Sequence, residues 1–232
     1  MMRLGVFLLL LLPTVLGIYS CSNASDYTSE NPNAAFFYPL DSIPKIYLYR
    51  DVSGGLDEEF HRIYTVKDQE GPHLIVEIYA SDGRIKEAFN YNIDSLNLQD
   101  YMVVDVNQEK EKALLYKDKL FPMHLNERTW FAAKFKGVVD STVMLSEVKR
   151  QFKRKENHLV MEDEEPTLVF SDLMRLTVLN PFTKKEEAKQ TTRISYFADG
   201  YGLVEWHSIN KKVHYRLEQV LTQQEWIKII TR

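Results

Sequence analysis

The stretch "HLIVEIYASDGRIKEAFNYNI" (residues 73–93) most constrains what this 232-residue chain can fold into. Apolar and polar side chains alternate along both of its halves, which is the pattern of a strand with one buried face. Between the halves, Asp82-Gly83 supplies the positive backbone angles that a tight hairpin turn needs. The stretch therefore predicts an antiparallel β-hairpin.

Similar alternation recurs from residue 36 onward in short runs separated by turns. The other runs lie at 45–50, 60–68, 101–106, 112–117, 129–136, 142–152, 158–162, 167–171 and 174–179, with three more inside 192–221. A sheet of about ten to twelve strands must curl or fold over to bury its apolar face. We predict an all-β, mainly antiparallel fold with few short helices: a large curved sheet, a partly open β-barrel or a sandwich.

Two segments are candidates for helices. One is a short segment at residues 94–100. The other is Thr222-Gln223-Gln224-Glu225, which matches a capping box at the start of a helix. The apolar residues that follow, 226–230, suit a strand equally well, so the sequence does not decide between a helix and a strand for this segment.

The body of the chain is expected to form one unit. Residues 36–232 contain no Gly/Ser linker, low-complexity run or fixed-period repeat, and the apolar content of 44% is enough for a sizeable core. We therefore predict a single β-rich domain there. The formal net charge of -4 gives no electrostatic reason to expect nucleic acid as a partner, because phosphate binding requires a basic face.

The first twenty residues have the pattern of a targeting segment. Arg3 provides a short positive start, and residues 4–12 are unbroken apolar residues. This run is shorter than the roughly 20 residues that a membrane-spanning helix needs. We predict a signal peptide over 1–20.

The sequence Ile18-Tyr19-Ser20-Cys21 resembles the lipobox of bacterial lipoproteins, with Ile18 and Ser20 matching well and Tyr19 bulkier than usual. The resemblance implies that Cys21 carries a lipid through a thioether, with palmitate or similar acyl chains anchoring the protein to a membrane of a bacterial cell envelope. Each buried methylene contributes about 0.8 kcal/mol, so two or three chains hold almost permanently. Ser22, in place of Asp, resembles the signal for retention in the outer membrane.

Two other interpretations of this region remain open. Ordinary cleavage could follow Gly17 and leave Cys21 a spectator, and Asn23-Ala24-Ser25 is formally a glycosylation site of a eukaryotic secreted protein. The single cysteine favours the lipoprotein, because a secreted eukaryotic domain of this size usually contains disulfides. Residues 21–35 are small and polar, and we predict a flexible tether there.

No pattern in the chain indicates catalysis, a metal or a cofactor. The six histidines are dispersed and form no HExxH motif, and there is neither a GxSxG elbow nor a phosphate-binding loop. His207 and His214 lie on neighbouring predicted strands and could approach, and the interpretation we favour is a chance pair on a half-solvated sheet rather than a metal site. We predict a protein that is not an enzyme and needs no metal or cofactor.

The run "KRQFKRK" (149–155) is followed by the acidic run "EDEE" (162–165). The interpretation we favour is a hairpin that projects beyond the core, with complementary charges on its two arms. The alternative is a basic surface that contacts anionic lipid or another polyanion.

The most distinctive phrase inside the domain is "YFADGYGLVEW" (196–206). Its aromatic strand end, Gly-x-Gly turn and following strand resemble, over about residues 190–220, envelope families related in shape to the lipoprotein carriers LolA and LolB. That resemblance implies an unclosed barrel around an apolar cavity. The candidate ligand-facing residues are Tyr196, Tyr201, Leu203 and Trp206, with the alternative that they are ordinary core residues.

Together these features predict a membrane-anchored envelope lipoprotein that acts as a non-enzymatic binding or assembly module for a lipid, an acyl chain or a partner protein. One alternative is a structural envelope protein that binds partners through sheet edges. The least favoured alternative is an envelope hydrolase, which would require His207 or His214 to cluster with carboxylates in a cleft.

Overall fold

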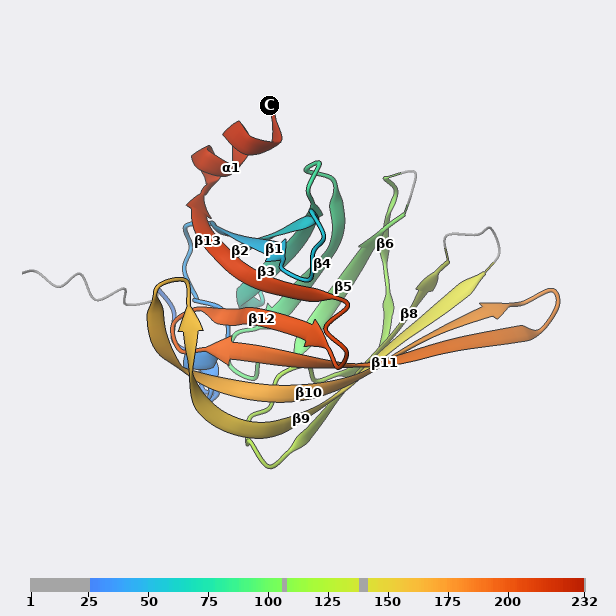
Figure 1. Ribbon diagram of the computed structural model, residues 1–232. Helices are drawn as coiled ribbons and strands as arrows, with labels where there is room; N and C mark the ends of the chain where they lie inside the picture. The colour runs from blue at the N-terminus through green and yellow to red at the C-terminus, as the bar shows by residue number, and fades with distance from the viewer. Residues whose placement is uncertain (1–25, 106–107, 138–141, 232) are drawn as a thin grey trace, which may run out of the picture.

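The computed structural model describes residues 26–105, 108–137 and 142–231, which form one antiparallel sheet of thirteen strands with a 3₁₀ helix and an α-helix (Figure 1). The elements are η1 (Ala34–Phe36), β1 (Lys45–Asp51), β2 (Glu58–Asp68), β3 (Gly71–Ala80), β4 (Ile85–Asn92), β5 (Leu98–Val104), β6 (Lys110–Lys112), β7 (Leu114–Asp118), β8 (Arg128–Lys136), β9 (Val143–Val160), β10 (Asp163–Asn180), β11 (Lys185–Ala198), β12 (Gly202–Ser208), β13 (His214–Thr222) and α1 (Gln223–Ile230).

The strand order follows the chain around a barrel. β1 pairs with β2 on one side and with β13 on the other, and the sheet ends at β6 and β7. Only Ala113 separates these two edge strands, and its amide donates to the Tyr101 carbonyl at 2.8 Å. A further bridge joins Asn97 to Lys119. One short segment thus pairs first with β5 and then with β8, so the predicted all-β sheet is nearly closed into a barrel.

Strands β9 and β10 are longer than the sequence pattern indicates. The pattern predicts two strands in each region, whereas the structure has one continuous strand of 18 residues in each. The two strands pair along almost their whole length, with a bulge at Lys153 of β9, opposite Val169 and Phe170. A bulge shifts the alternation of side chains by one residue, and the pattern therefore looks interrupted where the strand continues.

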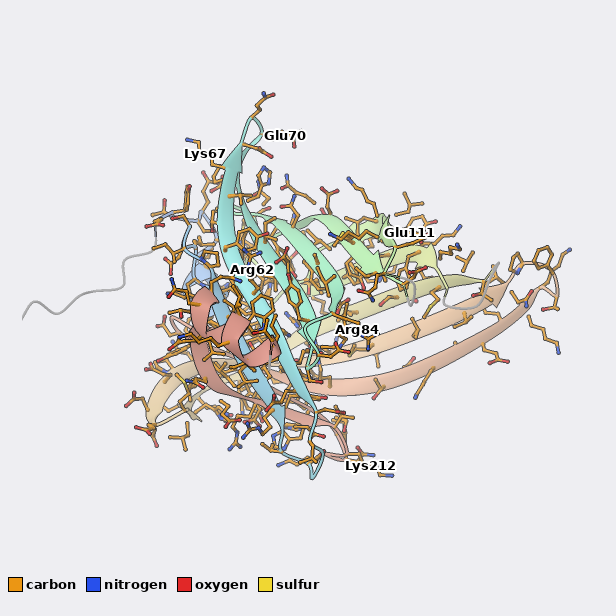
Figure 2. The ribbon with its side chains drawn as sticks, turned by 90° about the horizontal axis from the view of Figure 1, so that it is seen from above. Arg62, Lys67, Glu70, Arg84, Glu111 and Lys212 are labelled. Carbon is orange, nitrogen blue, oxygen red and sulfur yellow. The ribbon has the colours of Figure 1, made fainter. Side chains whose placement is uncertain are left out.

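The hairpin that projects from the barrel is β10–β11, with its tip at residues 181–184. Figure 2, viewed from above, shows it extending away from the other strands. Its tip residue Phe182 is 79% exposed. The basic run 149–155 and the acidic run 162–165 do belong to one hairpin, β9–β10. The expectation that the basic run projects beyond the core is wrong, because it lies within β9 opposite residues 168–173 and Arg150 is buried inside the barrel.

The segment before β1 crosses one end of the barrel. Ser29 donates to the Ile93 carbonyl at 2.6 Å, Asn33 donates to the Met123 carbonyl at 2.9 Å, and Asn31 is buried. The part of the expected tether that the structure describes, residues 26–35, is thus packed against the β4–β5 and β7–β8 connections. The asparagine and serine side chains explain this, because they satisfy loop carbonyls that face the barrel end.

Gly202 sits where this segment meets the β11–β12 turn. Its φ is +83°, and a Cβ placed there would lie 2.8 Å from the ring of Tyr38 and 2.9 Å from the backbone of Phe37. Glycine is therefore required both for its backbone angle and for the close approach. The Phe37 ring continues into the barrel core, where it packs 4.9 Å from the ring of Phe121.

The C-terminal end is helical. Thr222 and Glu225 form the full capping box, with the Thr222 hydroxyl accepting from the Glu225 amide at 3.3 Å and the Glu225 carboxylate accepting from the Thr222 amide at 2.8 Å. Trp226 then packs on Phe60 in a small core on the outer face of β1 and β2. The helix considered at 94–100 is wrong, because a turn and the start of β5 occupy those residues. In the described part of the chain, no helix is long and apolar enough to cross a membrane.

Candidate ligand cavity inside the barrel

A cavity of about 310 Å³ lies inside the barrel and is lined from both halves of the sheet. Successive side chains of a strand point to opposite faces, so every second residue of each strand reaches the interior. Much of the lining is aromatic, including Phe89, Tyr91, Tyr101, Phe131, Trp206 and Tyr215. Charged groups from β2 and β4 line one side, and charged groups from β9 and β11 come from the opposite side of the strand order.

Glu59 and His61, both on β2, begin the first charged wall. The Nε2 atom of His61 lies 3.0 Å from Glu59 Oε1, its Nδ1 atom lies 3.0 Å from the Tyr38 hydroxyl, and Lys86 Nζ lies 2.5 Å from Glu59 Oε2. Burial favours a raised pKa, but the hydrogen bond and charge of His61 and the charge of Lys86 outweigh it and lower the pKa of Glu59 to about 2. Glu59 is therefore an ionised and fully partnered carboxylate.

Glu87, on β4, completes this wall with a carboxylate that is only half partnered. The Tyr101 hydroxyl donates to its Oε2 atom at 2.6 Å, and within the described residues its Oε1 atom has no partner. Burial, aided by the nearby negative charge of Glu59, outweighs the Tyr101 hydrogen bond and raises the pKa of Glu87. A cation in the cavity would stabilise the ionised form of this group.

The opposite wall is centred on Asp172, which is 0% exposed. Arg150 donates to both carboxylate oxygens at 2.7 and 2.9 Å, Arg193 Nη2 donates at 3.2 Å, and the Ser195 hydroxyl donates at 2.7 Å. Burial opposes ionisation, but the two guanidinium groups hold the pKa of Asp172 well below its usual range. Arg150 and Arg193 are direct cross-strand neighbours of Asp172 on β9 and β11, and the three charges leave this wall net positive.

Two polar atoms of buried side chains at the cavity have no hydrogen-bond partner among the described residues: the Tyr91 hydroxyl and the Trp206 indole nitrogen. Their side chains are 5% and 7% exposed, and both line the cavity. Burial and the Glu87 charge raise the pKa of Tyr91, whereas Arg150 and Arg193 oppose that rise. The Tyr91 hydroxyl therefore lies within electrostatic reach of both charged walls.

The candidate ligand-facing residues separate into three environments. Leu203 and Trp206 line the barrel cavity. Tyr201 lines a second hollow, between the β11–β12 turn and the segment before β1. Tyr196 packs outside the barrel cavity, with its ring 4.5 Å from that of His158. Cys21, the predicted lipid-attachment residue, lies outside the described residues.

A second buried carboxylate, Glu205, lies on the outer face of the same wall. It accepts hydrogen bonds from His158 at 3.0 Å, His214 at 2.8 Å and Arg216 at 3.0 Å. Burial favours a raised pKa, but these three donors outweigh it and lower the pKa of Glu205 to about 2. The rings of His207 and His214 do approach, at 5.3 Å. Over the residues that the structure describes, no group of His, Cys, Asp and Glu side chains is arranged to hold a metal ion.

The charged residues of the cavity were missed by the sequence interpretation, although a signal for them exists. In β10, Asp172 stands two residues from Phe170 and two from Met174, both of which face the interior. A charged residue in register with an apolar face must either be paired or bind something, because an isolated buried charge is costly. The same test points to His61, which stands two residues before Ile63, and to Glu87, which stands two residues before Phe89.

Comparison with solved structures finds two similar chains. A "putative lipoprotein" from Parabacteroides distasonis ATCC 8503 has a TM-score of 0.49 and 11% sequence identity, covering 80% of this chain and 98% of that chain. A "putative exported protein" with a YmcC-like fold from Bacteroides fragilis NCTC 9343 has a TM-score of 0.43 and 12% identity, covering 81% and 99%.

No protein-family model matches the chain, and no curated protein matches it. Neither of the two similar structures is described as a LolA or LolB carrier, so that resemblance stays a prediction.

Proposed function

We propose that this protein is a membrane-anchored lipoprotein of a bacterial cell envelope, which binds a small amphipathic molecule inside its barrel and performs no chemistry on it. The observation that carries the proposal is the cavity of about 310 Å³, in which an aromatic lining surrounds polar groups of Glu87, Tyr91 and Trp206 that have no hydrogen-bond partner within the described residues. Polar groups that line a cavity and have no protein partner are available to a ligand with matching donors and acceptors.

The ligand is an amphipathic lipid in this proposal, because the lining offers both apolar rings and charged groups. Native mass spectrometry of the protein purified from cells, followed by solvent extraction, is expected to release one class of lipid. Val148→Trp fills the cavity, since Val148 lines it, whereas Lys149→Trp adds the same bulk on the outer face of β9. Bound lipid should be lost only in the first variant; equal loading of the two, with circular dichroism showing both folded, would contradict the proposal.

The anchor is tested separately. Cys21→Ser is expected to move the protein from the membrane fraction to the soluble fraction and to abolish labelling with a palmitate analogue, because the thioether to diacylglycerol cannot form. Sucrose-gradient separation of the membranes then tests the outer-membrane location that Ser22 suggests. Fatty-acid labelling that persists in the Cys21→Ser protein would contradict the anchor.

A partner protein bound at a sheet edge is the second candidate, and one feature of the projecting hairpin favours it. Strand β12 pairs with β11 only from Arg193 onward, so residues 185–191 present an open edge. The edge carries Lys185, Glu186, Glu187 and Lys189, and charged residues on an edge suppress unspecific pairing. A photocrosslinker at position 188 in cells should trap one partner reproducibly; none trapped would remove this candidate.

The hydrolase alternative requires a histidine–carboxylate cluster in a cleft, and the structure has such a cluster outside the barrel cavity. His214 meets Glu205 on the outer face, and neither residue lines the barrel cavity. Three donors already engage Glu205, which supports a structural role for the cluster.

A further inference from the structure

The chemical class of the ligand can be argued from the charges of the cavity; this inference rests on the proposed function. The wall from β2 and β4 carries the free oxygen of Glu87, and the wall from β9 and β11 carries two guanidinium groups against the single carboxylate of Asp172. A ligand with only one charge satisfies one wall and leaves the other uncompensated. A ligand with two opposite charges satisfies both.

We propose that the cavity binds a zwitterion of the phosphoethanolamine type, with its ammonium group at Glu87, its phosphate at Arg193 and the Tyr91 hydroxyl between them. Phosphoethanolamine occurs both as a free small molecule and as the head group of a lipid. The chemistry of the two charged ends is the same in both.

The ammonium end is assigned to Glu87 on two grounds. The free Oε1 atom of this carboxylate can accept a charge-assisted hydrogen bond, and a primary ammonium group has three donors to offer. Stacked rings stand beside it: Phe89 lies 4.8 Å from Tyr101, and 6.1 Å from Tyr91. Aromatic faces attract cations, most strongly where water is excluded.

The phosphate end is assigned to Arg193 rather than to Arg150. Arg150 uses Nε and both terminal nitrogens on Asp172 and the Leu120 carbonyl, at 2.7 to 2.9 Å. Arg193 binds Asp172 only through Nε and Nη2, at 3.4 and 3.2 Å, and its Nη1 atom has no partner within the described residues. Arg193 also lines the cavity, so a free guanidinium donor is available to an anion there.

An acyl chain on the same head group has a path out of the cavity. Ser146 lines the cavity, and its cross-strand neighbour Leu176 is followed on the inner face by the pair Met144 and Val178. Met144 and Val178 are half-buried and Leu176 is 37% exposed, and the three apolar side chains lead toward the projecting β10–β11 hairpin. The lipid-borne zwitterion therefore gains apolar contacts that the free head group does not.

The test measures binding of five probes to the purified protein by isothermal titration calorimetry, below the micellar concentration of each. The probes are myristoyl lysophosphatidylethanolamine, myristoyl lysophosphatidic acid without the ammonium group, tetradecylamine without the phosphate, neutral monomyristoyl glycerol, and O-phosphoethanolamine without the chain. The zwitterionic lipid is expected to bind at least tenfold more tightly than each of the other three chain-bearing probes. Comparable binding of O-phosphoethanolamine would identify the free molecule as the ligand instead of a lipid.

Two variants test which residue binds each charged end of the ligand. Glu87→Gln keeps an acceptor for Tyr101 but removes the charge, and it should lower affinity for lysophosphatidylethanolamine about tenfold while leaving lysophosphatidic acid unchanged. Arg193→Gln should lower affinity for lysophosphatidylethanolamine and lysophosphatidic acid about tenfold and leave tetradecylamine unchanged. Glu218→Gln on the outer face of β13 is the control and should change nothing. Circular dichroism and the unfolding midpoint establish that each variant is folded, and Arg193→Lys, which keeps the charge, should restore most of the phosphate binding.

The outcomes separate this inference from the proposed function. If the four chain-bearing probes bind equally, or if Glu87→Gln binds lysophosphatidylethanolamine like the unmodified protein, the zwitterion is wrong and an amphipathic ligand still stands. If none of the five probes binds, the proposed function fails together with the inference. Selective loss of probe binding in Glu87→Gln and Arg193→Gln supports both the proposed function and the zwitterionic ligand.

Discussion

Two carboxylates, Asp172 and Glu205, occupy the two faces of the same barrel wall and are held in different ways. Asp172 faces the interior, where the guanidinium groups of Arg150 and Arg193 approach it from both neighbouring strands. Guanidinium groups remain charged at every pH at which the protein folds. The inner carboxylate therefore sits in a permanent arrangement of charges.

Glu205 faces outward, and its donors are of another kind. His158 and His214 each supply one ring nitrogen, and Arg216, which is half exposed, supplies one guanidinium nitrogen. Imidazole is the side chain whose charge changes near neutral pH. The carboxylate on the cavity side is therefore bound by guanidinium groups with a permanent charge. On the solvent side, two of the three donors to the carboxylate are imidazole rings.

Removing the charge of each carboxylate should give the largest difference in stability between the two faces. Asp172→Asn leaves Arg150 buried beside a neutral group and is expected to cost about 3–5 kcal/mol of unfolding free energy. Glu205→Gln should cost about 1–2 kcal/mol, because the half-exposed Arg216 is still solvated when its carboxylate partner is lost. Urea unfolding followed by circular dichroism measures both losses of unfolding free energy. Equal losses would mean that Asp172 contributes no more to stability than Glu205 does.

Exchanging arginine for lysine tests the geometry of the donors rather than their charge. Arg150→Lys loses the bidentate contact and the bond to the Leu120 carbonyl, with an expected cost of about 1–3 kcal/mol. Arg216→Lys changes one hydrogen bond at the surface, where the cost should be about 0.5 kcal/mol or less. The same unfolding experiment applies, and a larger effect at Arg216 would reverse the assignment of the two faces.

The acid sensitivity of stability gives the smallest effect. The pKa of Glu205 is lowered from its ordinary value of 4.5 to about 2, so its stabilising contribution is complete above pH 4.5 and is lost as the pH falls toward 2. Glu205→Gln should therefore flatten the loss of stability over this range by about 1 kcal/mol, after allowance for screening by solvent at Arg216.

The matched control for the acid measurement is Glu218→Gln, which removes an exposed carboxylate paired with Arg50. Its pH profile should overlay that of the unmodified protein. An unchanged profile in Glu205→Gln as well would show that His158 and His214 do not hold the Glu205 carboxylate in solution.

Most of the strands are predictable because their signal is local. The hairpin at residues 73–93 follows from alternation and from Asp82-Gly83, and the structure has it as β3 and β4. The prediction was wrong where a bulge interrupts the alternation, as at Lys153 in β9, where the predicted strand 142–152 ends. The capping box of Thr222 and Glu225 was visible in the sequence, but the choice of a helix depended on packing of the following residues against β1.

The cavity was less predictable. Leu203 and Trp206 could be singled out because they belong to a distinctive phrase, whereas Glu87 and Arg193 look like ordinary polar residues of exposed strand faces. The strands that carry Glu87 and Arg193 lie about a hundred residues apart in the chain, on opposite sides of the strand order. Pattern within one strand therefore cannot show that two such side chains share a cavity.

The amino-acid sequence was sufficient for the class of fold, since alternation and turn residues act between near neighbours and bias each strand before any barrel exists. It also carries the lipobox-like Ile18-Tyr19-Ser20-Cys21, a linear signal that needs no tertiary context. The pairing of β1 with β13, the near-closure at Ala113 and the two charged walls arose from contacts between distant segments. Those contacts place Glu87 and Arg193 around one cavity, because closing the sheet brings the inner faces of remote strands together.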